Sequence, residues 1–440
     1  MKRAALAVMV AACSQNGTLS VSLVTAPGST VLDDVQTLQL TLTSPLTTQV
    51  ATREGSGFSI VLQVDTTDGA GELIVEGLDG SGNLVAAGQS PPFPVDALDA
   101  TFAIFMAAPN TMAASPAALD PPLDEMAVGS LSFGALFAGG RDASLAPSAA
   151  VTIYDGFDHT VTQGTPLPDA RAGVAMGIAS GVYAYMFGGT DASGSAQAND
   201  WLFDTSESST GIFSDFGAKP GFERANQSLL QVDADDFLLT GTPAAELSDL
   251  TGIPAARGDV TSLPASGAVT TGSDGNIEAI FVDGSGVTRY QDAIDKVDTL
   301  AAPGVARDGA TVIALPSGLV GVFCGGSDAA VIDAVTGDVT PIANVPSDDR
   351  VSGCAVAANS SFVVIAGGTL GSGGVATTAE IYDASTFTLI ATTPLVVPRT
   401  DATALALPND QILVAGGDDQ NGAPIATIEL FTPLPTIPQP

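Results

Sequence analysis

The chain contains three cysteines and one histidine, whose chemistry can be judged from a sequence most directly. Cys324 and Cys354 can pair as a disulfide if the protein is exported; two buried free thiols are the alternative. A Ser–His–Asp triad would have to recruit His159 itself, and we interpret this residue instead as a solvated histidine in a turn. The sequence holds no His-rich zinc motif, Cys-x-x-Cys pair, Gly-x-Ser-x-Gly elbow or Gly-Lys-Ser/Thr phosphate loop. We therefore expect no cofactor and no metal centre of these kinds.

Carboxylates are the abundant chemical group, with 48 Asp and Glu residues against 13 Lys and Arg and a formal net charge of −35. Two carboxyl groups placed together could hydrolyse a glycosidic bond, but so many acids pair by accident and no motif frames such a site. A surface of this charge repels phosphate backbones and anionic lipids. The composition therefore argues against nucleic acid as a partner and leaves cationic partners open.

One acidic loop has the composition of a calcium loop. Asp79–Asn83 reads Asp-Gly-Ser-Gly-Asn, which spaces oxygen ligands closely but lacks the full EF-hand pattern. The same residues favour a tight hairpin turn. We interpret the segment as a turn, and calcium stays open.

The N-terminus resembles the signal peptide of bacterial lipoproteins. Met1-Lys2-Arg3 is basic, and the nine apolar residues that follow span roughly 14 Å as a helix, which is too short for a bilayer. Val10-Ala11-Ala12-Cys13 is similar to the lipobox. The resemblance implies that residues 1–12 are removed and that Cys13 carries a lipid. Since Ser14 is not the Asp associated with inner-membrane retention, it implies an outer-membrane lipoprotein; a secreted or periplasmic protein is the alternative.

Residues 13–108 have the pattern of a small β-sandwich. Gly (49) and Pro (28) are abundant and charged residues reach only 14%, which is a turn-rich β composition. Leu38, Leu40 and Leu42 alternate with polar residues, and similar period-two runs lie near residues 19–23, 58–64, 73–78 and 102–106. Alternation of this kind places one face of each strand in a core. We expect an immunoglobulin-like sandwich without that family's Cys pair, acting as a spacer.

Residues 109–440 contain a sevenfold repeat. A hydrophobic strand that ends in Gly-Gly recurs, with degenerate copies at two positions, and the first glycines fall at 139, 188, 241, 284, 325, 367 and 416. The spacing of 41 to 53 residues is close to the kelch period. Five of the ten arginines occupy one further repeat position, shortly after a proline: Arg171, Arg224, Arg307, Arg350 and Arg399. Arginines placed in this way are structural.

The Gly pair, a following aromatic and the Pro–Arg step together resemble the kelch repeats of bacterial galactose-oxidase-like proteins, over about three quarters of the chain. The resemblance is plain in segments such as residues 379–386 and weak in the degenerate copies. It implies four-stranded blades that bury their faces only against neighbours and so close into a ring. A copper radical oxidase of that fold needs two His ligands, and the single histidine excludes it.

Closure of the ring requires a strand from the other end of the repeat region. The last copy stops after its third strand, at residues 425–431, and residues 110–116 resemble the fourth strands of other copies. We expect this segment to complete the last blade. The fold class is therefore all-β, with a sandwich at 13–108 and a kelch-like propeller at 109–440. Seven blades are expected, or six if a degenerate copy is an insertion.

The long loops between second and third strands share one face of such a ring with the loops between blades. Binding residues concentrate on loops carried by a rigid scaffold, so this face is the candidate site. Its most polar members are Arg141, Asp142, Asp191, Asp418 and Asp419. Solvated turns without a ligand are the alternative.

The sequence therefore predicts an exported, lipid-anchored, monomeric propeller that binds another protein and has no catalytic activity. Recognition of a glycan or cell-wall polymer on the same face is the second hypothesis. With only one Trp and five Tyr, the chain has few aromatic rings to stack on sugars. A carboxylate-based hydrolase is the third hypothesis, and it would need two loop acids to converge at the centre of the ring.

Overall fold

The computed structural model describes residues 16–55, 58, 61–65, 69–95, 101–234, 236–248, 253–256, 260–302 and 304–437. Strands dominate these residues, and their one helical element is the short 3-10 turn η1 (Asp292–Ile294). The predicted all-β class is confirmed. In the described part of the chain, no helix has the length and apolarity needed to cross a membrane. Cys13 and the signal-like segment lie outside the described residues.

The N-terminal body consists of two main sheets that enclose one core. Strand β1 pairs with β4 antiparallel and with β9 parallel, while the second sheet has the order β3-β2-β6-β7, and β5 and β8 form a short extra pair. Leu38, Leu40 and Leu42 all point inward, as their alternation predicts. The strands are β1 (Asn16–Val24), β2 (Thr37–Thr43), β3 (Leu46–Thr52), β4 (Val61–Asp65), β5 (Ala70–Gly71), β6 (Leu73–Leu78), β7 (Leu84–Gln89), β8 (Phe93–Pro94) and β9 (Thr101–Phe105).

Seven four-stranded antiparallel sheets follow in the described residues, an arrangement consistent with a β-propeller. We number these ring sheets in chain order. Sheets one to three are β11 (Ala127–Leu131), β12 (Gly134–Ala138), β13 (Val151–Asp155) and β14 (Thr160–Gln163); β15 (Ala175–Ala179), β16 (Tyr183–Phe187), β17 (Asn199–Asp204) and β18 (Ile212–Ala218); and β19 (Leu229–Gln231), β20 (Asp236–Leu239), β21 (Ala245–Ser248) and β22 (Ile253–Ala256).

The remaining ring sheets cover the second half of the chain. They are β23 (Gly267–Thr271), β24 (Ile277–Asp283), β25 (Gly286–Gln291) and β26 (Lys296–Leu300); β27 (Thr311–Ala314), β28 (Val320–Phe323), β29 (Asp328–Ile332) and β30 (Val339–Ala343); β32 (Ala355–Ala358), β33 (Phe362–Ala366), β35 (Thr378–Asp383) and β36 (Leu389–Pro394); and β37 (Thr403–Ala406), β38 (Ile412–Ala415) and β39 (Thr427–Thr432) with β10 (Thr111–Ala118). Two short strands, β31 (Arg350–Ser352) and β34 (Thr369–Leu370), pair with each other outside sheet six. In the chain, β31 precedes β32, and β34 lies between β33 and β35.

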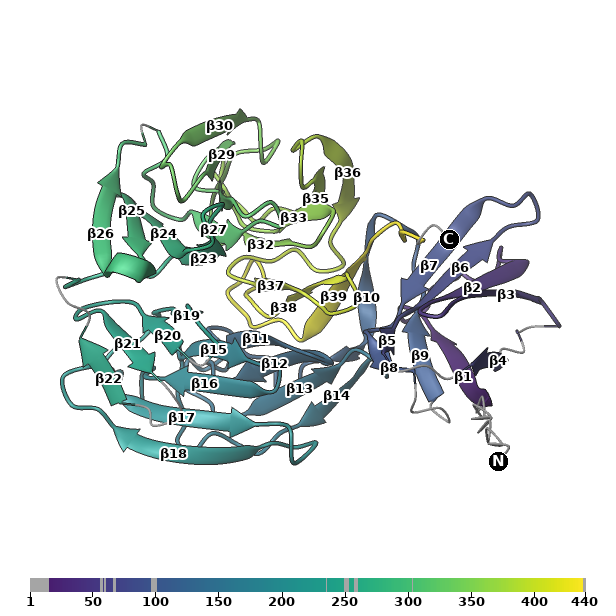
Figure 1. Cartoon of the computed structure of the whole chain (residues 1–440), viewed down its shortest axis with the longest axis horizontal. Helices are drawn as coiled ribbons and strands as arrows, with labels where there is room; N and C mark the ends of the chain where they lie inside the picture. The colour runs from purple at the N-terminus through teal and green to yellow at the C-terminus, as the bar shows by residue number, and fades with distance from the viewer. Residues whose placement is uncertain are drawn as a thin grey trace, which may run out of the picture.

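The seven ring sheets form a closed circle. The first strand of each sheet contacts the first strands of both neighbours, and β37 of sheet seven contacts β11 of sheet one. Figure 1 shows these first strands near the centre and the fourth strands β18, β26 and β30 on the rim. β10 pairs antiparallel with β39, with Thr111 opposite Thr432. The expected completion of the last sheet by an N-terminal segment is confirmed.

The Gly pairs and the Pro–Arg steps recur together because they touch. The second glycine of a sheet donates its backbone N–H to the carbonyl of the arginine that begins the next sheet, at 2.8 Å for Gly140 to Arg171 and 2.8 Å for Gly368 to Arg399. A Cβ on Gly367 would lie 2.2 Å from the Arg399 carbonyl oxygen, and its φ is +61°. Only glycine combines this backbone angle with this approach.

Four of the five repeated arginines, Arg171, Arg224, Arg350 and Arg399, are buried, in keeping with the structural role expected for their position. Arg350 and Arg399 are fully buried and bond to backbone carbonyls and to Glu380 and Glu429, with Nη2–Oε1 distances of 3.1 and 2.7 Å. Arg171 instead lies 5.6 Å from the ring of Trp201, which occupies the equivalent place in sheet two. Each buried guanidinium therefore has either an anionic or an aromatic partner.

Sheet one lacks both members of this ion pair. The bridge Asp124–Arg141 in sheet one corresponds to the bridge Thr400–Asp418 in sheet seven. Leu123, which precedes Asp124, is therefore the counterpart of Arg399, which precedes Thr400. Strand register likewise makes Thr152 the counterpart of Glu429, since each lies opposite the residue two before the first glycine. The chain thus carries its own uncharged replacement for the buried pair.

A disulfide between Cys324 and Cys354 joins ring sheets five and six, with a Cα–Cα distance of 6.5 Å. Both residues are buried, Cys324 directly after β28 and Cys354 directly before β32. A cross-link over this loop restricts the unfolded chain and is worth about 3 kcal/mol. It fastens two neighbouring sheets at the second-to-third-strand end.

The sandwich contacts ring sheets one and seven through loops at the opposite end. Ala103 of β9 donates its backbone N–H to Phe157 (3.0 Å), and the Asn409 amide donates to the Gln89 carbonyl (3.1 Å). Phe102 and Phe157 stack with ring centroids 5.4 Å apart. Figure 1 shows the sandwich beside β10 and β39. The sandwich is thus docked on the ring.

His159 belongs to this junction, so its interpretation as a solvated turn histidine is wrong. The side chain is buried; its Nε2 accepts the Phe105 backbone N–H at 3.2 Å, and its Nδ1 lies 2.7 Å from the Tyr154 hydroxyl. Because Nε2 accepts, Nδ1 carries the proton and donates to the hydroxyl. His159 is buried although it lies in a turn, because the sandwich covers this turn. Burial lowers the pKa of His159 to about 4.

We predict that Arg399→Leu destabilises the ring by about 3–5 kcal/mol, because it leaves Glu429 charged and buried. The double variant Arg399→Leu/Glu429→Thr should recover most of this loss, since it recreates the Leu123/Thr152 arrangement of sheet one. Denaturant midpoints of the parent, the two single variants and the double variant test this. A double variant less stable than Arg399→Leu would contradict the account.

We further predict that His159 weakens the fold in acid. The pKa of His159 in the folded state lies below its unfolded value, so the unfolded state binds more protons between about pH 6.5 and 4. As the pH is lowered through this window, the free energy of unfolding therefore decreases by up to about 1.4 kcal/mol per pH unit. In His159→Gln this contribution is absent, while the carboxyl groups that titrate in the same range are unchanged. The measurement is the denaturant midpoint of the parent and of His159→Gln at several pH values between about 4 and 6.5. Equal dependence of the two midpoints on pH would rule out the contribution of His159.

Candidate functional site

The loops that carry the predicted site residues lie on the face opposite the loops that hold the sandwich. In sheets one, two and seven, the loop after the second strand forms a β-bridge with the segment just before the first strand: Asp124 with Arg141, Ala172 with Thr190, and Thr400 with Asp418. The sandwich instead contacts loops between first and second or third and fourth strands. This face, called the loop face below, is therefore free of the sandwich.

A ring of left-handed residues surrounds the centre of the loop face. One residue shortly before six of the seven first strands has a φ between +46° and +74°: Glu125, Gly173, Asn226, Gly309, Gly353 and Asp401. Backbone hydrogen bonds link neighbours, with Gly173 N to Glu125 O at 3.0 Å, Asn226 N to Gly173 O at 2.8 Å and Asp401 N to Gly353 O at 2.9 Å. We call these six residues the collar. It fixes the positions of the side chains beside it.

Carboxyl groups gather on and around the collar. Two collar positions are themselves acidic, and further acids lie next to the collar or in the adjoining loops. We call this set the acidic rim: Asp124, Glu125, Asp308, Asp349, Asp401 and Asp418. Carboxylates carried on a rigid backbone ring produce a concentrated negative potential at this place.

Arg141 is a basic side chain of the rim, and it is already engaged. Its Nε lies 2.8 Å from Glu125 Oε2, and its two terminal nitrogens donate to the Thr190 hydroxyl (3.0 Å) and the Leu145 carbonyl (3.2 Å). These contacts connect sheet one to sheet two. Arg141 therefore neutralises Glu125 and leaves the charges of Asp124 and Asp418 largely uncompensated.

Asp124 and Asp418 are brought together where sheet seven meets sheet one. Each has a buried Oδ1 that makes no hydrogen bond within the described residues. Burial first, and then the charges of Asp418 and Glu125, raise the pKa of Asp124 to about 6. Burial, Asp401 and Asp419 likewise raise the pKa of Asp418. Two half-buried carboxylates that repel each other are an unfavourable arrangement that a cation would relieve.

Asp142, Asp191 and Asp419 occupy equivalent positions and close the turns of three loops. The Oδ1 atom of each accepts the backbone N–H groups two and four residues later, at 2.8 and 3.1 Å for Asp142. Hydrogen bonds lower the pKa of all three carboxyls, the largest contribution coming from Ser144, Ser193 and Ala423 respectively. These three predicted residues shape the loops that surround the rim.

Sequence reasoning missed Asp124, Glu125 and Asp401, although a signal for Asp401 was present. Four collar residues stand two positions after a repeated arginine, in the pattern Arg-x-Gly/Asn/Asp at 171–173, 224–226, 307–309 and 399–401. Glycine, asparagine and aspartate are the residues that adopt a left-handed backbone most readily. The pattern identifies four of the six collar positions, Asp401 among them. Asp124 and Glu125 follow Leu123 and not a repeated arginine, so the pattern does not reach them.

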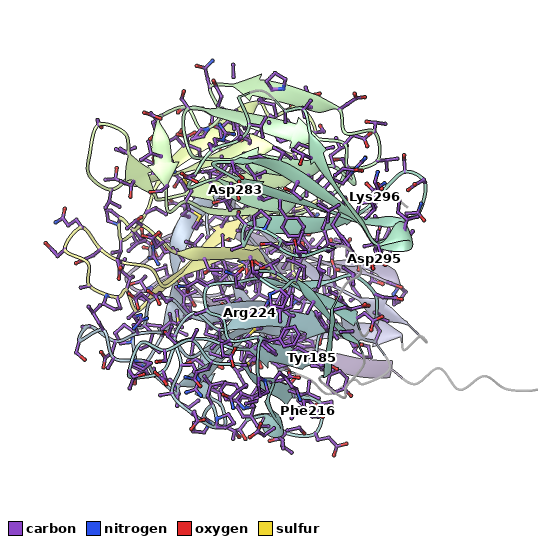
Figure 2. All side chains as sticks on the ribbon, turned by 90° about the vertical axis from the view of Figure 1, so that its left-hand side faces the viewer. Tyr185, Phe216, Arg224, Asp283, Asp295 and Lys296 are labelled. Atoms are coloured by element: carbon purple, nitrogen blue, oxygen red, sulfur yellow. A yellow bond between two sulfur atoms is a disulfide. The ribbon has the colours of Figure 1, made fainter. Side chains whose placement is uncertain are left out.

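Asp200 is a second buried acid that sequence reasoning missed. It lies on β17 opposite Phe187, is 1% exposed, and has an Oδ2 atom without a partner among the described residues. Burial raises its pKa to about 7, against a lowering by nearby Lys219. The surrounding interface between sheets two and three contains the Tyr185–Phe237 ring pair and Arg224; Figure 2 labels Tyr185, Arg224 and Phe216 on this side of the ring. Asp200 belongs to this packing and not to the rim.

Aromatic and metal-binding chemistry is sparse at the loop face. Trp201 and the tyrosines 154, 185, 290 and 382 are buried between ring sheets. In the described ranges, no group of three or more His, Cys, Asp or Glu side chains is placed to hold a metal ion. Asp79 uses its carboxylate to accept N–H groups of Ser81 and Asn83, so the loop considered for calcium is closed by its own hydrogen bonds.

No protein-family model matches this chain, and no curated protein matches it. Among solved structures, the structure of YjhT is similar to it with 14% sequence identity, over 72% of this chain and 96% of that chain, at a TM-score of 0.44. A likeness of this size carries no argument about function.

We predict that Asp124→Asn stabilises the protein at pH 7.5 by on the order of 1 kcal/mol, after allowance for solvent screening. Its raised pKa means that the folded state binds the proton more tightly, so the penalty exists above about pH 6 and disappears as pH falls toward 4. Thermal unfolding at pH 7.5 and pH 5 measures the difference. A variant destabilised equally at both pH values would show that the Asp124 charge is not under strain.

Proposed function

We propose that this chain is a non-catalytic binding scaffold whose acidic rim takes up a basic segment of another protein. The observation that carries the proposal is the pair Asp124 and Asp418 on the loop face, two half-buried carboxylates whose buried Oδ1 atoms make no hydrogen bond within the described residues. A lysine or arginine side chain would supply both the missing donors and the missing charge. The rigid collar supports the rim, as a binding surface requires.

We also propose that the ring is a seven-bladed kelch-type propeller attached to an immunoglobulin-like sandwich. Seven four-stranded sheets in a closed circle and the linked Gly-Gly and Pro–Arg contacts support the ring. The parallel pairing of β1 with β9 beside a second, antiparallel sheet supports the sandwich. On this interpretation the docked sandwich leaves the acidic rim free.

Export and lipid anchoring belong to the same proposal. The Cys324–Cys354 disulfide supports an oxidising compartment, and the lipobox-like Val10–Cys13 segment supports attachment to a membrane through Cys13 alone. An outer-membrane lipoprotein combines these features. Metabolic labelling with palmitate, lost in Cys13→Ser, tests this part separately.

A carboxylate-based hydrolase is the second candidate, because Asp124 and Asp418 converge and the pKa of Asp124 is raised to about 6. A general acid needs such a pKa, and its partner carboxylate must stay ionised. Hydrolysis of neutral oligosaccharides by the parent that is abolished in Asp124→Asn would favour this candidate. A sugar-binding rim has less support, since the Trp and most Tyr rings are buried.

The binding proposal predicts that a Lys/Arg-rich decapeptide binds the mature chain and that Asp124→Asn/Asp401→Asn/Asp418→Asn weakens binding by tenfold or more, which is about 1.4 kcal/mol. Calorimetry at 50 and 200 mM NaCl measures this, and affinity should fall with salt. The matched control Asp233→Asn/Asp274→Asn/Asp338→Asn removes the same charge from exposed turns at the other end of the strands. Equal losses in the two triple variants would reduce the effect to overall charge and overturn the proposal.

A further inference from the structure

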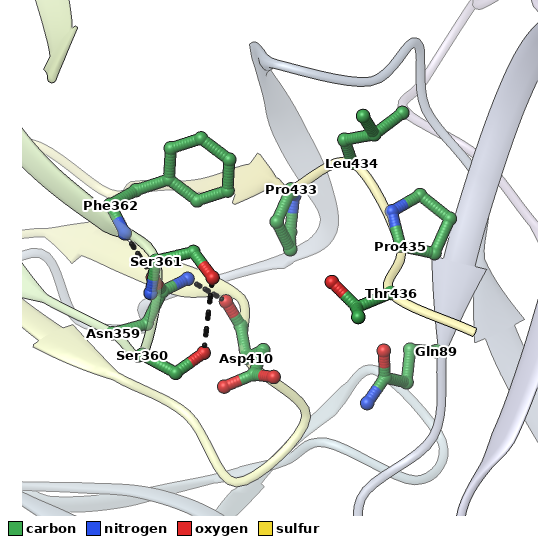
Figure 3. Close-up of a pocket in the computed structure, with 10 residues that line it drawn as sticks. All are labelled: Gln89, Asn359, Ser360, Ser361, Phe362, Asp410, Pro433, Leu434, Pro435 and Thr436. Atoms are coloured by element: carbon green, nitrogen blue, oxygen red, sulfur yellow. Dashed lines mark hydrogen bonds between the residues drawn. The ribbon is translucent and has the colours of Figure 1, made fainter. Parts of the chain in front are cut away.

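A cavity of about 160 Å³ lies where the sandwich, the ring and the C-terminal segment meet. Its walls come from four parts of the chain: Gln89 of β7, residues 359–362 at the start of β33, Asp410 in the loop before β38, and residues 433–436 after β39. Figure 3 shows these segments around one common space. The volume corresponds to about five water molecules, or to one small organic ring.

The walls of the cavity are held in place by their own hydrogen bonds. Asn359 is buried; its amide donates to the Asp410 carbonyl at 2.6 Å, and its oxygen accepts the backbone N–H groups of Ser361 and Phe362 at 3.0 and 2.7 Å. The Phe362 ring packs edge-on against Phe431 at 5.4 Å. The cavity is therefore preformed, which lowers the cost of binding.

The groups facing the cavity offer both donors and acceptors. Ser360 and Ser361 present hydroxyl oxygens 3.4 Å apart, and Figure 3 shows the side chains of Gln89, Asp410 and Thr436 directed toward the same space. The Gln89 amide nitrogen donates to Glu72 at 2.6 Å, so its oxygen is available as an acceptor. Phe362 and the prolines add apolar surface. A ligand with several hydroxyl groups on a compact ring matches this mixture.

The lining also selects against anions. It contains no basic side chain and includes one carboxyl group, Asp410, with Glu72 close behind Gln89. Burial raises the pKa of Asp410, and burial together with Asp410 raises that of Glu72, so negative charge is already disfavoured here. An acidic ligand would add a further unpaired charge.

We propose that this cavity binds a neutral monosaccharide ring, either as a free sugar or as the end of a glycan chain. The ring would bridge the sandwich and the propeller-like body through Gln89 and Asp410. The site lies at the sandwich junction, away from the acidic rim, and does not depend on the protein-binding function proposed above.

Calorimetry of the mature chain with glucose, galactose, mannose and their disaccharides tests the proposal. At least one neutral hexose should bind with a Kd of about 1 mM or tighter, and glucuronic acid should bind at least tenfold more weakly. If a disaccharide binds as tightly as the hexose, the cavity accepts the terminal sugar of a glycan chain. If only the hexose binds, the ligand is the free sugar.

Two variants locate the site. Asp410→Asn suits the left-handed backbone there (φ +58°), and Ser361→Ala removes one hydroxyl; each should weaken hexose binding by tenfold or more. Asp295→Asn is the matched control, since Asp295 is also left-handed (φ +51°) but lies in ring sheet four between η1 and β26. The hexose affinity of this variant should stay within twofold of the parent. Absence of binding by every neutral hexose, or binding unchanged in both site variants, would overturn the proposal.

Discussion

The antiparallel pairing of β10 with β39 is the interaction on which the rest of the structure depends. Each ring sheet buries its two faces only against neighbours, so an open ring would expose the apolar faces of sheets one and seven. β10 comes from the start of the repeat region and completes the sheet that ends it. Because β9 leads directly into β10, the same closure also fixes the sandwich against the ring.

The closure has a direct consequence for the proposed site. Asp124 follows β10 in the chain, and Asp418 follows β38 of the sheet that β10 completes. These two half-buried carboxylates therefore lie at the seam of the ring, where a loss of β10–β39 pairing would separate them. Favourable strand pairing and apolar packing hold this unfavourable charge arrangement in place, as is common at functional sites.

Much of the fold could be predicted from the sequence because its determinants are local and repeated. Glycine spacing indicated the strand ends, and the recurrence of arginine after proline indicated structural side chains, a role that fits the burial of Arg350 and Arg399. The glutamates that pair with them could not be predicted, since Glu380 and Glu429 have no counterpart in sheet one, and partners some 30 residues apart leave no local pattern. His159 was misjudged for the same reason, because a distant strand buries it.

The candidate face could be derived from the sequence, but most acids of its rim could not. The loop face followed from strand alternation, and Arg141 and Asp418 do lie at the rim. Asp142, Asp191 and Asp419 proved to be turn-closing residues, because a short acidic loop places its N–H groups around its own carboxylate. Asp124 stands next to the collar residue Glu125, in a sheet where Leu123 takes the place of the repeated arginine, so no repeated residue marks it. Its place becomes evident only when neighbouring sheets are aligned.

Hydrogen–deuterium exchange with and without the Lys/Arg-rich peptide tests the central claim, that the acidic rim is the binding surface, most directly. The account predicts slower exchange on binding in residues 123–128 and 399–404, which carry the collar and the rim, and no change in loops such as 156–159 at the sandwich junction. Protection confined to the sandwich-facing loops, or spread evenly over the acidic surface, would contradict it.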